Sequence, residues 1–92
     1  MDAILIKTTG ETTFVTPKNG KDFTLEELYT LIGCDMIEVV YPEWDSDCIF
    51  VIDEEGKLNG KDINYPATLM WGYGGADVLV GDVIYCKSEM VK

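Results

Sequence analysis

The chain has 92 residues, 47% hydrophobic and 26% charged, which suits one small domain with its own core and is too short for two. Seventeen Asp and Glu against seven Lys, with neither Arg nor His, give a net charge of −10. This charge repels nucleic acid and anionic membranes, so neither is expected as a direct partner. Without Arg, the chain lacks the guanidinium group that usually binds phosphate with two N–H groups, and without His it lacks the side chain that titrates near neutral pH. Both absences argue against an enzyme.

The cysteines at positions 34, 48 and 86 are widely spaced, and each lies beside an apolar run. Their number and spacing match no metal-ligand pattern, so we expect reduced, mostly buried thiols in a cytoplasmic protein, without metal or cofactor. The chain opens directly into an apolar strand, without a basic region followed by a long apolar stretch. We therefore expect neither a signal peptide nor a transmembrane span.

The first half of the chain predicts a hairpin, a helix and a third strand. Residues 3–8 and 12–16 are rich in β-formers and are separated by a turn at Gly10. Thr24 and Glu27 have the spacing of a capping box, and the apolar positions that follow predict a helix ending at Gly33. Residues 36–41 are again apolar and β-branched, which predicts a strand.

The second half predicts two strands around a shorter helix. Residues 48–52 form an apolar strand, followed by turns at 53–56 and 59–60. Asn64 can cap a helix over residues 66–70, because proline is tolerated in a first turn. Residues 77–86 predict the last strand, with a bulge at Gly81.

The predicted order is therefore β-β-α-β-β-α-β, in one domain spanning residues 1–92. That order is typical of the α+β class. We expect a five-stranded antiparallel or mixed sheet with both helices on one of its faces.

Three parts of the second half carry a family resemblance: residues 51–60 with Glu-Glu-Gly-Lys-Leu, Ile63-Asn64 with Ala67-Thr68, and residues 77–84 with Val-Gly-Asp-Val. Together with the Leu-Glu-Glu-Leu helix of the first half, they resemble the small domains of unknown function 3846. The resemblance implies a setting in bacteriophages, plasmids and their host bacteria, with no enzymatic activity attached. The chain has Tyr65-Pro66 where basic residues are frequent in the family, which implies that any anion contact there is lost or replaced.

Acidic side chains gather on two loops at opposite ends of the predicted strand 48–52. Paired carboxylates can bind a divalent cation or act in acid–base catalysis, but their spacing matches no calcium loop. They form either an ordinary solvated surface or an acidic contact surface for a basic partner. The six residues are Glu43, Asp45, Asp47, Asp53, Glu54 and Glu55.

Aromatic residues and helix-end amides form a second candidate surface. Exposed aromatics often mark a recognition surface, and the start of the second helix and the glycine run 72–75 offer amides to an anion. Ordinary packing is the alternative for the aromatics. The candidate ligand-binding residues, with the nearest cations, are Lys57, Lys61, Asn64, Tyr65, Trp71 and Tyr73.

These surfaces give two functional expectations. The first is a non-enzymatic phage or mobile-element protein that counters host defence by sequestering a small nucleotide-like ligand, between the protomers of a homo-oligomer. The second is an acidic inhibitor that mimics nucleic acid and blocks a basic surface of a defence nuclease or another nucleic-acid enzyme. An enzyme or a housekeeping module is the remaining class.

Overall fold

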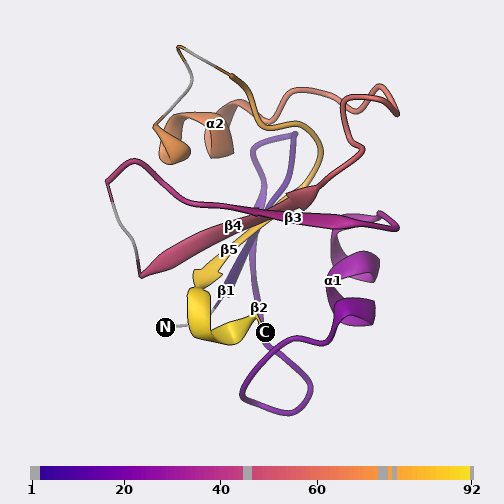
Figure 1. Ribbon diagram of the computed structural model, residues 1–92, viewed down its shortest axis with the longest axis vertical. Coiled ribbons are helices and arrows are strands. Elements are labelled where there is room, and N and C mark those ends of the chain that lie inside the picture. The colour runs from indigo at the N-terminus through magenta and orange to yellow at the C-terminus, as the bar shows by residue number, and fades with distance from the viewer. Residues whose placement is uncertain (1–2, 45–46, 73–74, 76, 92) are drawn as a thin grey trace.

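The computed structural model describes residues 3–44, 47–72, 75 and 77–91, which form a five-stranded sheet with a helix on each face (Figure 1). The predicted α+β class and the order β-β-α-β-β-α-β are confirmed. The strands are β1 (Ala3–Ile6), β2 (Thr12–Val15), β3 (Ile37–Val40), β4 (Cys48–Asp53) and β5 (Val83–Lys87). The helices are α1 (Leu25–Ile32) and α2 (Tyr65–Trp71), and a 3-10 turn, η1 (Ser88–Met90), follows β5.

The last strand of the chain is the centre of the sheet. The strand order is β2-β1-β5-β4-β3, and every neighbouring pair is antiparallel. The strand β5 therefore lies between the pairs β1–β2 and β3–β4 and connects them into one sheet. The segment that leads into β5 decides where the two halves of the sheet meet.

The two faces of the sheet bury separate cores. Leu5, Val51 and Ile84 belong to the core on the α1 side, whereas Phe50 and Val83 belong to the core on the α2 side. The prediction that both helices cover one face is therefore wrong. The reason lies in β4, where the side chains on both faces of the strand are apolar and buried, so each face of the sheet needs a covering element.

The predicted strand 77–86 is shorter than expected. The strand β5 begins at Val83, and Val80 pairs only through an isolated bridge with Ile63. Gly81 has φ 76° and its N–H donates to the carbonyl oxygen of Asp62 at 2.8 Å, so the chain turns there. The expected bulge is thus a turn, and residues 77–80 lie outside the main ladder.

The start and end of α1 are as predicted. The Thr24 hydroxyl accepts from the Glu27 N–H at 3.1 Å, and the Glu27 carboxylate accepts from the Thr24 N–H at 2.9 Å. Hydrogen bonds from the N–H groups of Thr24 and Lys18 lower the pKa of Glu27. Gly33 ends the helix with φ 77°.

The three cysteines are free thiols, with Cys48 and Cys86 buried and Cys34 half-buried. Burial raises the pKa of Cys34, and it raises the pKa of Cys86 to about 12. No helix in the described part of the chain is long and apolar enough to cross a membrane.

Cys86→Val is expected to flatten the loss of stability at alkaline pH. The unfolded thiol releases its proton near its ordinary pKa of 9.0 and the folded thiol near about 12, so the unfolded state binds fewer protons between these values. Stability should fall across that window by up to about 1.4 kcal/mol per pH unit from this group. Urea unfolding at a series of pH values measures the slope, and an unchanged slope in Cys86→Val would contradict the assignment.

Candidate functional site

Asn64 ties the start of α2 to the centre of the sheet, and its side chain is fully buried. Its Nδ2 donates to the carbonyl oxygens of Ile6 and Gly81, both at 2.9 Å, and its Oδ1 accepts from the Ala67 N–H at 3.1 Å. Its backbone N–H donates to the carbonyl oxygen of Leu79 at 2.8 Å. Asn64 therefore caps α2 as predicted. Its buried side chain has no surface for a ligand, so the structure gives it an anchoring role.

Thr68, one turn further along α2, extends this anchor. Its hydroxyl donates to the carbonyl oxygen of Asn64 at 2.7 Å and accepts from the Leu79 N–H at 2.9 Å. Residues 77–80 are thereby held alongside α2, next to the sheet.

The same segment lies close to the turn after β4 because of Gly56. A Cβ atom at this position would lie 2.7 Å from a methyl carbon of Val80 and 3.3 Å from the backbone oxygen of Asp53. Only glycine permits this approach without a shift of the neighbouring chain. The turn and residues 77–80 therefore form adjacent walls.

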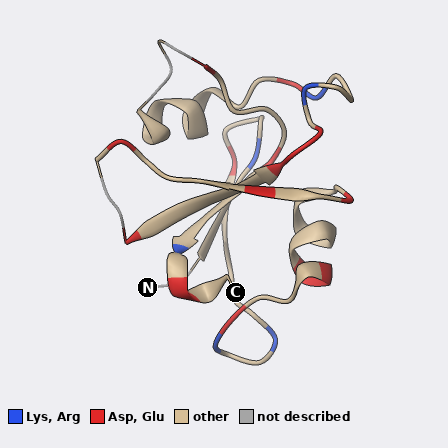
Figure 2. Cartoon of the chain, viewed as in Figure 1, with Lys and Arg blue, Asp and Glu red and all other residues tan. Residues whose placement is uncertain are grey.

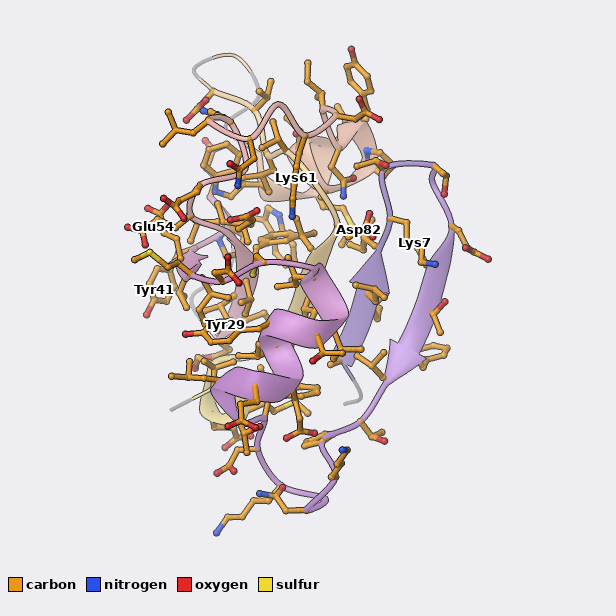
Figure 3. The ribbon with its side chains drawn as sticks, turned by 90° about the vertical axis from the view of Figure 1, so that its right-hand side faces the viewer. Lys7, Tyr29, Tyr41, Glu54, Lys61 and Asp82 are labelled. Carbon is orange, nitrogen blue, oxygen red and sulfur yellow. The ribbon has the colours of Figure 1, made fainter. Side chains whose placement is uncertain are left out.

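Asp53, at the end of β4, is a buried carboxylate, only 5% exposed. Its Oδ1 accepts from the Glu55 N–H at 2.9 Å, and its Oδ2 lies 2.8 Å from Nζ of Lys61. The Lys61 ammonium also donates to the carbonyl oxygen of Gly33 at 2.8 Å, beyond the end of α1 (Figure 3). Oδ2 has no well-aligned hydrogen-bond donor among the described residues, so Lys61 compensates its charge. Both side chains are used in the fold.

Three hydrogen bonds fasten the loop after β3 to the end of α2. The Trp71 indole N–H donates to the carbonyl oxygen of Tyr41 at 3.1 Å, and the Glu43 N–H donates to the carbonyl oxygen of Trp71 at 2.9 Å. The Trp44 indole N–H donates to the carbonyl oxygen of Met70 at 2.5 Å. The half-buried ring of Trp71 is thus fixed beside the edge of the sheet.

A cleft of about 280 Å³ opens between the β3–β4 edge and residues 77–80. Val40, Ile52 and Trp71 supply its apolar part. Glu38 and Glu54 also line it, from β3 and from the turn after β4. The cleft is the place where β3, β4, α2 and the segment leading into β5 meet.

The charge of this cleft is negative. Glu38, Glu54 and Asp77 line it together with Lys57, whose ammonium is paired with the Asp77 carboxylate. The hydrogen bond from the Lys57 ammonium, together with one from the Val78 N–H, lowers the pKa of the Asp77 carboxyl group. Three carboxylates against one ammonium leave an excess of two negative charges, beside the neutral pair of Asp53 and Lys61. Such a cleft favours a cationic group and opposes a phosphate.

The predicted ligand-binding residues are only partly brought together. Lys57 and Trp71 line the cleft, whereas Lys61 and Asn64 are engaged in the fold. Tyr65 is exposed on the first turn of α2 and lines a separate hollow next to Leu69. Tyr73 lies outside the described residues.

The predicted acidic surface is divided in the same way. Figure 2 shows acidic segments at both ends of the β3–β4 pair, so they do not form one patch. Glu43 lies next to Gly72 at the end of α2, and Asp47 is exposed before β4. Glu54 is exposed and lines the cleft, and Glu55 is half-buried. Asp53 is buried against Lys61, which corrects its assignment to a contact surface, and Asp45 lies outside the described residues.

Two acidic residues of the cleft, Glu38 and Asp77, were not among the predicted site residues. Glu38 stands alone as a charge in an apolar strand, and its register opposite Ile52 places it on the α2 side of the sheet. That isolated charge was a usable signal. Asp77 gives no local signal, because only the tertiary fold brings it to Lys57, 20 positions away along the chain.

Among the described residues, no group of three or more Cys, Asp or Glu side chains is arranged to hold a metal ion.

The fold and the cleft define a small α+β domain with one antiparallel sheet between two helices. The chain belongs to the family described as Domain of unknown function (DUF3846), which matches residues 1–90. Comparisons with curated proteins and with solved structures found no match.

Asn64→Ala is expected to lower the free energy of unfolding by about 3 kcal/mol, because two buried carbonyl oxygens and one buried N–H lose their partner. Asn59→Ala is the matched control, since Asn59 is exposed in the turn after β4 and should change stability by less than about 0.5 kcal/mol. Urea unfolding measures both. Equal effects of the two substitutions would contradict the anchoring role.

Lys61→Met is expected to destabilise the fold by about 3 kcal/mol, because it leaves the Asp53 carboxylate buried without a counter-charge. The double variant Asp53→Asn, Lys61→Met should recover most of that loss. Lys57→Met is the control, since its pair with Asp77 is exposed and should matter little. Chemical unfolding of the four proteins tests this, and a double variant no more stable than Lys61→Met would count against the pair.

Proposed function

We propose that this domain is a non-enzymatic binding protein that presents carboxylates to a basic surface of a host nucleic-acid enzyme. In this proposal it is a cytoplasmic, phage- or mobile-element-encoded inhibitor of host defence. The main support for this proposal is that the two lysines nearest the cleft are each paired with a carboxylate. Lys57 is paired with Asp77 and Lys61 with Asp53, so the cleft of a chain with net charge −10 has no free cation among its described residues.

The cleft suits a lysine or arginine side chain of the partner. The stem of such a side chain can pack on Val40, Ile52 and the ring of Trp71, and its cationic head can lie between the carboxylates of Glu38 and Glu54. Arginine fits best because its planar guanidinium stacks on aromatic rings and bonds carboxylates with two parallel N–H groups. Lys57 competes for Asp77, so the third carboxylate is shared.

The rest of the surface supports the same class of partner. A net charge of −10 on a small domain steers it toward basic surfaces and raises the rate of encounter, an effect that salt screens. Affinity then depends on the carboxylates that contact the partner, and the remaining charge acts at long range. This is the behaviour expected of a nucleic-acid mimic.

Binding to a short oligo-arginine peptide tests the cleft by titration calorimetry. Glu38→Gln and Glu54→Gln should each weaken binding about fivefold at low salt. Glu26→Gln is the matched control, because Glu26 is exposed on α1, on the other face of the sheet, and removes the same charge. Equal losses from Glu26→Gln and Glu38→Gln would mean that only net charge matters, and binding that ignores salt would sink the proposal.

Sequestration of a nucleotide-like ligand is the second candidate, because Trp71 and Lys57 both line the cleft and offer a ring and a cation to a base and a phosphate. The three carboxylates weigh against it. The same protein is screened against cyclic dinucleotides and ADP-ribose derivatives by thermal shift, with Lys57→Met as the variant. A rise in Tm that Lys57→Met removes would favour this candidate over the inhibitor.

A further inference from the structure

The sheet has two open edges, and the chain protects them unequally. At the β3 edge, Glu38 places a charge on the strand, and the carbonyl oxygen of Tyr41 just beyond it accepts from the Trp71 indole N–H. Pro42 follows directly, and Pro17 stands at the corresponding place beyond β2, so the two edges differ in charge and not in proline. The other edge strand, β2, consists of Thr-Thr-Phe-Val and has no charge and no bulge against β1. Charges, prolines and bulges are the features that keep sheet edges from pairing with another chain.

The backbone of β2 offers hydrogen bonds on its outer side. The Lys7 N–H donates to the carbonyl oxygen of Glu11 at 2.9 Å, and in the register Leu5 lies opposite Thr13. Because hydrogen-bonded pairs alternate along an antiparallel ladder, the peptide groups of Thr13 face β1 and those of Thr12 and Phe14 face outward. Figure 3 shows β2 as the outermost strand on this side of the molecule.

The side chain at the middle of this edge is apolar and exposed. Phe14 is 74% exposed and lies on the α2 side, opposite Ile4 in the register. A hollow of about 130 Å³, lined among others by Ile6 and Met70, lies next to it. Burial of the exposed Phe14 ring by a neighbouring strand would contribute a favourable free energy to pairing.

We propose that β2 pairs antiparallel with β2 of a second copy of this chain, with Phe14 opposite Phe14 of the partner subunit. This register also sets Thr12 opposite Thr16 of the partner subunit and Thr13 opposite Val15 of the partner subunit. Positions 12, 14 and 16 alternate, so their outward peptide groups meet in one continuous ladder. No charged side chains stand directly opposite each other along these positions. Two aromatic rings meet at the two-fold axis.

The second copy is favoured over a basic partner because the edge strand itself is uncharged, whereas the acidic cleft lies along the β3–β4 edge. Pairing through β2 joins the two sheets at the edges farthest from the clefts and leaves both clefts open. Each copy carries −10, so repulsion opposes the pairing and salt should strengthen it. This salt dependence has the opposite sign to that of the proposed inhibitor binding.

Sedimentation equilibrium tests the pairing from about 10 µM to about 1 mM protein, at about 0.05 M and about 0.5 M NaCl. The average mass should rise toward twice the monomer with concentration, and more steeply at high salt. Phe14→Lys should weaken dimerisation at least about tenfold. Leu58→Lys is the matched control, because Leu58 is 84% exposed in the turn after β4 and the substitution adds the same charge away from β2. Thermal unfolding checks that both variants remain folded.

Amide hydrogen exchange supplies a second measurement at the level of single residues. In the parent protein the N–H groups of Thr12 and Phe14 should gain protection as concentration and salt rise, and those of β3 should not. A monomer under all conditions would overturn the proposal and leave the edge to a strand from a different protein. Dimerisation of Phe14→Lys equal to that of Leu58→Lys, or new protection at β3, would also overturn it. Phe14 does not line the cleft, so the outcomes for Phe14→Lys are independent of the inhibitor tests.

Discussion

The buried amide of Asn64 is the interaction on which the arrangement of this sheet depends. The central strand β5 is the last strand in the sequence, and it lies between the pairs β1–β2 and β3–β4. The Asn64 side chain bonds the end of β1 and the turn at Gly81 that opens β5, and it caps α2 at the same time. A buried amide that is fully paired specifies one geometry, because any displacement leaves polar groups without partners. The position of residues 77–80, and hence the cleft, follows from it.

The local parts of the fold were predictable because their causes are local. The capping box at Thr24 and Glu27 and the cap at Asn64 are encoded within a few residues, and the structure confirms them. The two-sided cover of the sheet was also encoded, in the uninterrupted apolar run of β4, but the prediction placed both helices on one face. Gly81 predicts a bulge from the sequence and forms a turn in the structure, because a glycine within an apolar run is compatible with both until its partner across the sheet is known.

The candidate site was less predictable because charges act through their neighbours in space. Lys57 and Lys61 are the nearest cations to the aromatic helix in the sequence, which made them candidates for an anionic ligand. Each is paired with a carboxylate, Asp77 and Asp53 respectively, one of them buried. Asp77 in particular reaches Lys57 through the turn at Gly56 and the course of the segment that leads into β5. Whether the net charge of the cleft is negative or positive therefore depends on the tertiary fold.

The two edges of the sheet have different characters, and the difference follows from how the chain uses its charges. Along β3 the chain places a glutamate, and just beyond the strand the carbonyl oxygen of Tyr41 accepts from the Trp71 indole N–H; Glu38 and Trp71 both line the acidic cleft. Along β2 the chain keeps four uncharged residues, although about one residue in four of the whole sequence is charged. In a protein of net charge −10 an uncharged edge is where another copy meets the least repulsion. The two proposals, binding of a basic partner and self-association, therefore involve opposite edges of one sheet and do not compete for residues.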